Sequence, residues 1–328
     1  MALNVPKLGA LPKVALSITG CVNECQERTR DRDGMRRNAH TTSTSVHLRH
    51  RVAVLHRSLG QTMVTLTDRA SPTAIHNTRV AARRLRVLLR TFRKEFDSEE
   101  VKRYMRHLKG ITRDLEAARE ADVTRHAIMQ LGRNRRGHMN SNSRELYERA
   151  VKRYESAIYD LRMTIAGDPW QQRLTDLWRL SVLSSLVKEN DDLAATVMHR
   201  VVKRRRRGLR RKLSKVGRSP KRLHRVRLKV KAMRYILAGC LSNRAVASNS
   251  EVKCLRQLQN CLGDMHDEEN LFKALRAEQR HHEAARDIAG KLQDRKSGHL
   301  HAFKGYRKDL MRLWDSAAFS TGHSGEMM

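Results

Sequence analysis

Two segments of the sequence place a histidine ahead of the same row of basic residues. IHNTRVAARRLRVLLR (75–90) has basic residues three, seven and ten positions after its histidine, and LHRVRLKVKAMRYILA (223–238) repeats that spacing. Guanidinium groups present forked donors that suit phosphate oxygens, and a nearby anion favours the protonated form of histidine. The spacing therefore predicts a binding site for a polymeric phosphate, and its residues are His76, Arg79, Arg83 and Arg86 in the first copy and His224, Arg227, Lys231 and Arg234 in the second.

Helical geometry would collect these side chains on one face of each helix. Each residue of an α-helix advances about 100°, so His76, the three arginines of its copy and Arg90 fall within an arc of roughly 80°. The opposite side of each helix is apolar, with Leu85, Leu88 and Leu89 in one copy and Met233, Ile236 and Leu237 in the other. Adjacent cations repel by a few tenths of a kcal/mol per pair. Because this cost recurs at matched positions in both copies, we expect His76 and His224 to contact phosphate and not merely to cap a helix or pack within the bundle.

A second pair of segments is duplicated in the same order. LEAAREADV (115–123) aligns with LGDMHDEEN (262–270), which sets Arg119 against His266 and Glu120 against Asp267. We treat Arg119 and His266 as secondary phosphate ligands. The acidic residues would either orient the basic side chains or make ordinary salt bridges.

The charge balance also indicates a polyanionic partner. The 328 residues carry 68 Lys and Arg against 34 Asp and Glu, a formal net charge of +34. Residues 200–234 hold eighteen Lys or Arg and no acid. Self-repulsion on this scale disfavours a compact state unless an anion neutralises it. Because 39% of the residues are hydrophobic, the chain is not a disordered polyelectrolyte.

The elements that must position these residues are helices. Five prolines and long stretches rich in Leu, Ala, Arg, Glu and Lys predict an all-α protein, and each motif follows a Ser-Pro pair typical of a helix start, Ser71–Pro72 and Ser219–Pro220. We expect helices at about 45–68, 73–96, 99–131, 142–166, 171–188, 190–215, 220–240, 249–278 and 281–315. The predicted domains are a flexible tail (1–44), a first helical half (45–168), a second helical half (169–316) and a disordered tail (317–328).

These motifs resemble those of the CHAD family, the conserved-histidine α-helical domain. HNTRVAARRLRVLLRTF and LHRVRLKVKAMRYILAGC are similar to its two signature helices, and the segments at 115–123 and 262–270 are similar to its Leu-Gly-x-x-Arg-Asp-x-Asp-Val segment. The pattern departs at Glu116, where Gly is usual, and at His266, where Arg is usual. The resemblance covers roughly residues 46–315. It implies two four-helix bundles related by a pseudo-twofold, with a basic channel between them in which the matching His, Arg and Lys residues bind inorganic polyphosphate.

Two other classes of function compete with polyphosphate binding. A charge of +34 would also attract duplex nucleic acid through counterion release, although aromatic residues are only 4% and offer few stacking platforms. A phosphate-handling enzyme is disfavoured because the chain has no GxxxxGK[ST] or HExxH motif, and DMHDEE (264–269) is the nearest approach to a metal site.

We therefore expect binding without catalysis, with no cofactor and no bound metal. Five cysteines without a CxxC pair suggest reduced thiols in a cytoplasmic protein, which we expect to associate with polyphosphate granules. No apolar run approaches the roughly 20 residues that span a bilayer, so no membrane partner is expected. No pattern specifies an oligomeric state.

Overall fold

The computed structural model describes residues 44–93, 98–134, 136–179, 191–217, 219–240, 249–276, 279 and 282–320. The fold is all-α, as predicted. An isolated β-bridge joins Arg133 to Met139, and the described residues form no strand. The tails expected at 1–44 and 317–328 lie outside the described residues, except for Thr44 in α2 and residues 317–320 in α11. The helices are α2 (Thr44–Asp68), α3 (Pro72–Thr91), α4 (Ser98–Asp114), α5 (Glu116–Leu131), α6 (Ser141–Ala166), α7 (Asp168–Arg179), α8 (Asp191–Ser214), α9 (Pro220–Cys240), α10 (Asn249–Leu275) and α11 (Glu283–Ser320).

The two motif helices begin where the Ser-Pro pairs predict. Ser71 caps α3, because its hydroxyl accepts a hydrogen bond from the Ala74 amide at 3.2 Å, and Pro72 is the first helical residue. α9 begins at Pro220 in the same way, and the amide of Leu223 donates to the Ser219 carbonyl at 3.0 Å. Proline suits this position because the first amides of a helix have no intrahelical acceptor.

The helix expected over 99–131 is divided at Leu115. This residue is fully buried and leaves the helical conformation (φ −86°, ψ 1°), so that α4 ends at Asp114 and α5 begins at Glu116. The guanidinium of Arg79 lies at the break, where it donates to the Thr112 carbonyl at 2.9 Å and to the Glu116 carboxylate at 3.1 Å. A predicted phosphate ligand is therefore also part of the joint between two helices.

α7 follows directly after α6 and belongs by its contacts to the helices that precede it. It packs against α4 and α6, Arg173 of α7 pairs with Asp114, and Asp176 lies 3.5 Å from His107. The expected boundary between residues 168 and 169 therefore falls after the first residue of α7, whereas the contacts of α7 are with the first half. Residues 180–188 of the helix expected there lie outside the described residues.

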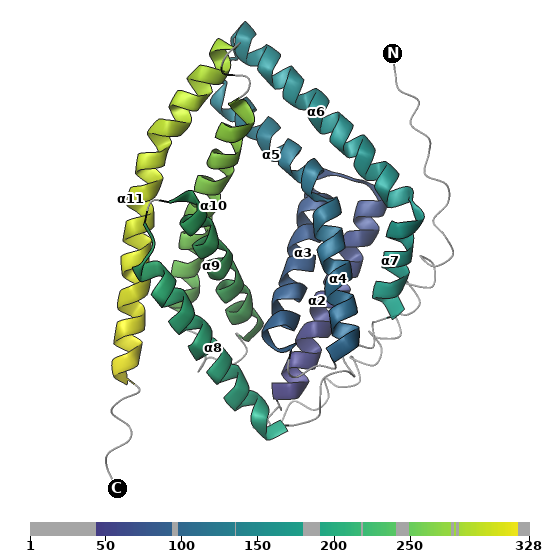
Figure 1. The fold of residues 1–328 in the computed structure, drawn as a ribbon, viewed down its shortest axis with the longest axis vertical. Coiled ribbons are helices and arrows are strands. Elements are labelled where there is room, and N and C mark those ends of the chain that lie inside the picture. Colours follow the sequence, from purple (N-terminus) through teal and green to yellow (C-terminus); the bar gives the residue numbers. More distant parts are fainter. Residues whose placement is uncertain are drawn as a thin grey trace.

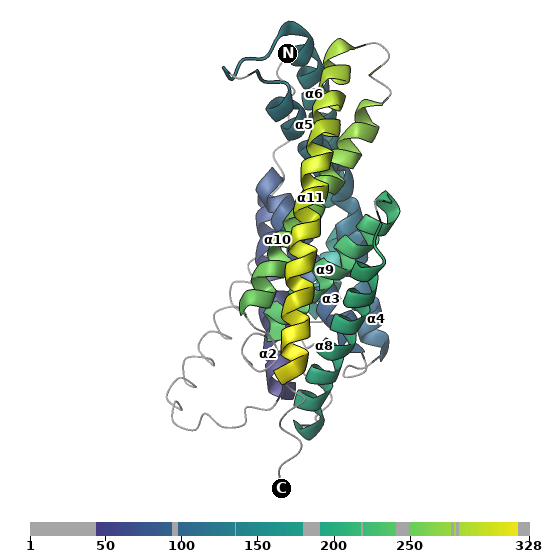
Figure 2. The same cartoon turned by 90° about the vertical axis from the view of Figure 1, so that its left-hand side faces the viewer.

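Helices α2–α7 and helices α8–α11 form two halves related by an approximate twofold. In Figure 1 the first half is purple to teal and the second is green to yellow, and α3 and α9 lie side by side near the centre. The main contacts between the halves join a helix to its counterpart, namely α2 to α8, α3 to α9, α5 to α10 and α6 to α11, and α5 also contacts α11. Contacts between counterparts are those expected about a twofold axis. Figure 2 shows α11 running along most of the molecule's length.

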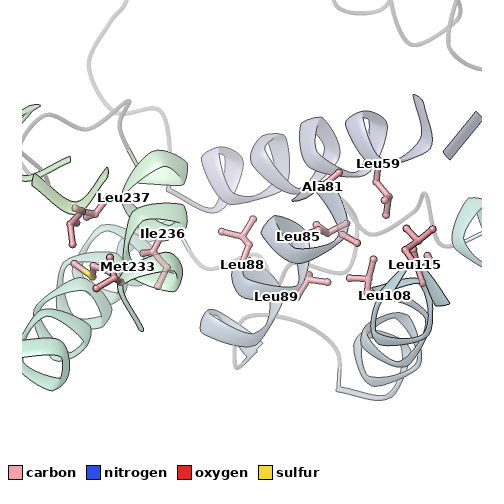
Figure 3. Close-up of a cluster of buried hydrophobic side chains, with 14 of the residues drawn as sticks. Leu59, Ala81, Leu85, Leu88, Leu89, Leu108, Leu115, Met233, Ile236 and Leu237 are labelled. Carbon is pink, nitrogen blue, oxygen red and sulfur yellow. The ribbon is translucent and has the colours of Figure 1, made fainter. Parts of the chain in front are cut away.

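One hydrophobic core is shared between the two halves. Leu85 and Leu89 of α3 and Ile236 and Leu237 of α9 are all fully buried. Figure 3 shows that Leu88 of α3, which is 4% exposed, lies between Leu85 of the same helix and Ile236 of α9. These are the apolar faces that the sequence predicts, so the cationic stripe of each motif helix is left on the side away from this core.

A second apolar cluster joins the halves at the end where α6 and α11 converge in Figure 1. Polar contacts cross there as well, because Lys291 of α11 donates to the Leu131 carbonyl at 2.9 Å and Asn142 of α6 donates to Glu283 at 3.3 Å. The halves are thus held together in two separate places. The buried residues of this cluster are Ile128, Leu131, Leu146, Ala150, Leu271, Leu275, Ala284, Ala285, Ile288 and Leu292.

A buried carboxylate connects three helices of the second half. Glu251 of α10 is 3% exposed. Its two oxygens accept hydrogen bonds from Arg206 of α8 at 2.9 and 2.6 Å, and Oε1 also accepts from the Trp314 indole of α11 at 2.7 Å. Arg206 is therefore a structural residue of the long basic tract.

Candidate anion-binding site

The basic stripes of α3 and α9 come close enough for Arg83 of α3 to influence Arg227 and Lys231 of α9. Arg83 of α3 and Lys231 of α9 occupy equivalent positions in the two motifs, and Arg83 is the strongest charged influence on the Lys231 amine. Equivalent residues interact directly only when both lie close to the axis. Burial, together with Arg83, Arg227 and Arg234, lowers the pKa of Lys231 to about 7, so that this amine is half neutral at pH 7.

Arg227 lies one turn from Lys231 and has few partners for its guanidinium. Its side chain is 15% exposed, and the nearest carboxylate oxygen, on Asp267, is 3.9 Å away. The Nε atom of Arg227 is buried and makes no hydrogen bond with any described residue, and the same is true of Arg234 Nε. Unsatisfied buried donors of this kind are costly in the free protein.

His224 and His266 form a pair at one end of the α9 stripe. Their rings are 4.7 Å apart and their Nδ1 atoms are 3.4 Å apart. The Asn270 amide nitrogen lies 3.4 Å from His266 Nε2, and a His266 that accepts at this atom carries its proton on Nδ1, facing His224. In that arrangement neutral His224 carries its own proton on Nε2.

Both imidazoles of this pair are neutral in the free protein at pH 7. Burial lowers the pKa of His266 to about 4, helped by Arg227, His224, Lys273 and Lys231. Burial, Arg227, Lys231 and Lys273 also lower the pKa of His224. A bound anion would oppose these effects and favour the charged imidazoles.

The first half contributes His76 and Arg119 to the same region. Burial lowers the pKa of His76, and the charges that lower it further are Arg119, Lys231, Arg83 and Arg79, which come from three helices. Arg119 donates to Asp122 at 2.8 Å, and Asp122 is only 3% exposed. The buried carboxylate fixes the direction of Arg119, since it also accepts from Arg125 at 3.0 Å and lies 3.1 Å from His126.

The predicted ligands thus form one connected group with an outlying end. Nine of the predicted ligands influence one another electrostatically around α3, α5, α9 and α10, and we call them the central cluster. They are His76, Arg79, Arg83, Arg119, His224, Arg227, Lys231, Arg234 and His266. Arg86 is near Arg83 and Arg90, and Arg90 is exposed at the far end of α3 beside Arg205. Arg86 and Arg90 therefore extend the basic surface beyond the cluster.

Two basic residues near the predicted ligands were missed from the sequence. Lys273 of α10 contributes to the field at both His224 and His266. It follows His266 by seven residues, or two helical turns, and this spacing could have placed it on the same face. Arg205 of α8 lies beside Arg90, and no spacing within the motifs would have indicated it.

Acidic residues near the central cluster are few, and some of them pair with its own cations, as Asp122 does with Arg119. Glu268 lies 3.0 Å from His299, and Glu269 lies 3.5 Å from Lys273. Glu116 accepts from Arg79, which leaves Asp267 as the carboxylate closest to Arg227. Among the described residues there is no group of three or more His, Cys, Asp or Glu that could hold a metal ion, and no helix is long and apolar enough to cross a membrane.

A pocket of about 760 Å³ opens beside the cluster, between the start of α9 and the facing parts of α10 and α11. His224 and His266 line one part of it. This pocket was not predicted from the sequence, because its walls come from three separate helices.

Fold and site together define an all-helical protein with internal twofold symmetry and a cationic cluster where its halves meet. Residues 53–276 match the CHAD domain family, and the chain belongs to that family. A comparison with curated protein sequences finds no match.

Two solved structures share the fold. The CHAD domain from the plant Ricinus communis is similar with a TM-score of 0.67 and 17% sequence identity, over 82% of this chain and 92% of that chain. PptA from Streptomyces chartreusis is similar with a TM-score of 0.62 and 14% identity, over 84% of this chain and 100% of that chain.

Proposed function

We propose that the protein binds inorganic polyphosphate without catalysis, through the central cluster and its extension by Arg86 and Arg90. The observation that supports this most directly is the approach of the α3 and α9 cationic stripes, with Arg83 and Lys231 at the axis and Asp267 the nearest carboxylate to Arg227. A row of phosphates would supply the missing counter-charges. Membership of the CHAD family adds to the proposal, since the resemblance implies a polyphosphate-binding channel between the halves.

The arrangement suits a polymer better than a single phosphate. The basic residues lie mainly along α9, from His224 beside His266 of α10, and along α3 as far as Arg90, so successive phosphates would each meet different donors. Charge-assisted hydrogen bonds from guanidinium groups are roughly twice as strong as neutral ones. We propose that the protein performs this binding in the cytoplasm, in association with polyphosphate granules.

The proposal is tested by removing cluster charges that do not support the fold. We would change Arg83, Arg227 and Lys231 together to Ala and leave Arg79 intact, because Arg79 holds the α4–α5 joint. The matched control changes three exposed cations of α4 to Ala, namely Arg103, Arg106 and Lys109. Titration calorimetry at physiological salt should show a loss of affinity of about 100-fold or more for the cluster variant only. Equal losses in both variants would mean long-range attraction and no built site.

Duplex nucleic acid is a second candidate, favoured by the exposed cations of α8. Arg204, Arg207, Arg211 and Lys212 are exposed, in a tract where Arg206 is already paired with Glu251. A competition between polyphosphate and duplex DNA of equal phosphate content separates the two candidates. Preference for DNA, retained in the cluster variant, would reverse the ranking.

A further inference from the structure

The pocket beside the central cluster is mainly apolar. Leu223 of α9, Leu262 and Phe272 of α10, and Leu292 and Leu300 of α11 all line it. Its volume of about 760 Å³ falls in the range typical of small-molecule sites, which is roughly 300–1,000 Å³. Polyphosphate has no apolar part, so its binding would leave these walls without a role.

Polar groups lie around the apolar walls. Lys221, Arg225, Lys273 and Lys296 line the pocket together with two acidic residues, Glu268 and Glu269, which pair with His299 and Lys273. The cations therefore outnumber the carboxylates at its edge. A ligand that fits both features has an aliphatic body and an anionic head.

The histidine pair connects this pocket to the central cluster. His224 and His266 line the pocket, and Arg227 follows His224 by one turn of α9. When neutral His224 accepts from His266 at Nδ1, it carries its own proton on Nε2 as a donor. An anionic head placed at the pair would meet this donor and the lysines at the edge, while its chain occupied the apolar space.

We propose that the pocket binds the chain of an aliphatic phosphate ester, such as a prenyl or alkyl diphosphate, with the diphosphate at the His224–His266 pair. The inference rests on the proposed function in one respect, namely that this pair belongs to a phosphate-binding surface. It adds a class of organic ligands that carry an aliphatic chain, which inorganic polyphosphate does not have.

Calorimetry with three probes tests whether both parts of the ligand are recognised. Geranyl diphosphate should bind at least about tenfold more tightly than inorganic pyrophosphate, because only the former buries apolar surface. It should also bind at least about tenfold more tightly than geraniol, which lacks the phosphates. Equal affinity for geranyl diphosphate and either of the other two probes would overturn the inference.

A pocket-filling variant locates the chain. Leu300→Trp places a bulkier, aromatic side chain on the α11 wall, and Leu228→Trp makes the same change at an exposed position of α9 outside the pocket. Leu300→Trp should weaken geranyl diphosphate at least about fivefold and leave polyphosphate affinity within about twofold, whereas Leu228→Trp should change neither. Met265→Trp, on the α10 wall, serves the same purpose if Leu300→Trp does not fold.

The outcomes for the two proposals can be told apart. If polyphosphate binds and the chain of geranyl diphosphate adds nothing, the pocket inference fails and the proposed function stands. If polyphosphate does not bind but geranyl diphosphate binds and is weakened by the filled pocket, the proposed function fails and the pocket inference stands. Unchanged geranyl diphosphate affinity in both pocket variants would place the chain elsewhere and refute the inference.

Discussion

Lys231 should take up a proton when polyphosphate binds. In the free protein, burial and three neighbouring arginines lower the pKa of this amine to about 7, against an ordinary value of 10.5. A polyanion favours the charged amine and so raises the pKa of Lys231 in the complex. The affinity should therefore be greatest below pH 7 and fall as pH rises through 7 towards the higher pKa of the complex.

The size of the effect follows from the pKa of the free protein. At pH 8 about nine-tenths of the Lys231 amines are neutral, so binding should take up about 0.9 proton per chain at this site. Above pH 7 the affinity should fall by up to about tenfold per pH unit. Measurement at pH 8 also minimises the contribution of terminal phosphates, whose second pKa is about 6.

The proton uptake is measured by titration calorimetry in two buffers that differ in ionisation enthalpy, such as Tris and HEPES. Lys231→Arg keeps the charge but cannot exchange a proton in this range, so it should lower the uptake at pH 8 by about 0.9 proton per chain. Lys229→Arg makes the same substitution at an exposed position of α9 and should leave the Lys231 contribution in place. Equal uptake by the wild type and Lys231→Arg would refute the low pKa and, with it, the crowding of cations at the axis.

Three further predictions concern stability. Polyphosphate should raise the melting temperature more as the polymer lengthens and less as salt rises, and orthophosphate at equal total phosphate should do much less, which a thermal-shift series checks. Glu251→Ala should cost about 3 kcal/mol of unfolding free energy in urea, because it removes the buried carboxylate that accepts from Arg206 and from the Trp314 indole, whereas Asp315→Ala, which breaks the exposed pair with Arg210, should cost less than about 1 kcal/mol. Burial lowers the pKa of His56 to about 4, so stability should fall by up to about 3 kcal/mol as pH falls from 6.5 through 4, and His56→Gln should flatten this decline in denaturation curves.

The motif helices are the part of the fold that the sequence specifies best. Local chemistry sets their beginnings at Pro72 and Pro220, and the helical repeat identifies their buried faces, such as Leu85 and Ile236. Both features depend on residues within one helix. The same repeat places the basic side chains on the other face, so the composition of the two stripes was also predictable.

The parts that could not be predicted depend on contacts between helices. The break at Leu115 coincides with hydrogen bonds from Arg79, which lies 36 positions earlier in the chain. The apolar pocket needs α9, α10 and α11 in their final arrangement. The double role of Arg79, as a predicted phosphate ligand and as a support for the α4–α5 joint, has the same origin.

The difference between Arg83 and Lys231 has a consequence for how such a protein can arise. In a homodimer, a residue on the twofold axis must face an identical copy of itself, so an arginine there would meet a second permanent charge. When the two copies are joined in one chain, each can mutate alone, and one of the facing residues can become an amine that releases its proton. Covalent fusion thus allows the repulsion at the axis to be relieved by replacing one arginine. A symmetric assembly of two identical subunits could relieve it only by losing both arginines.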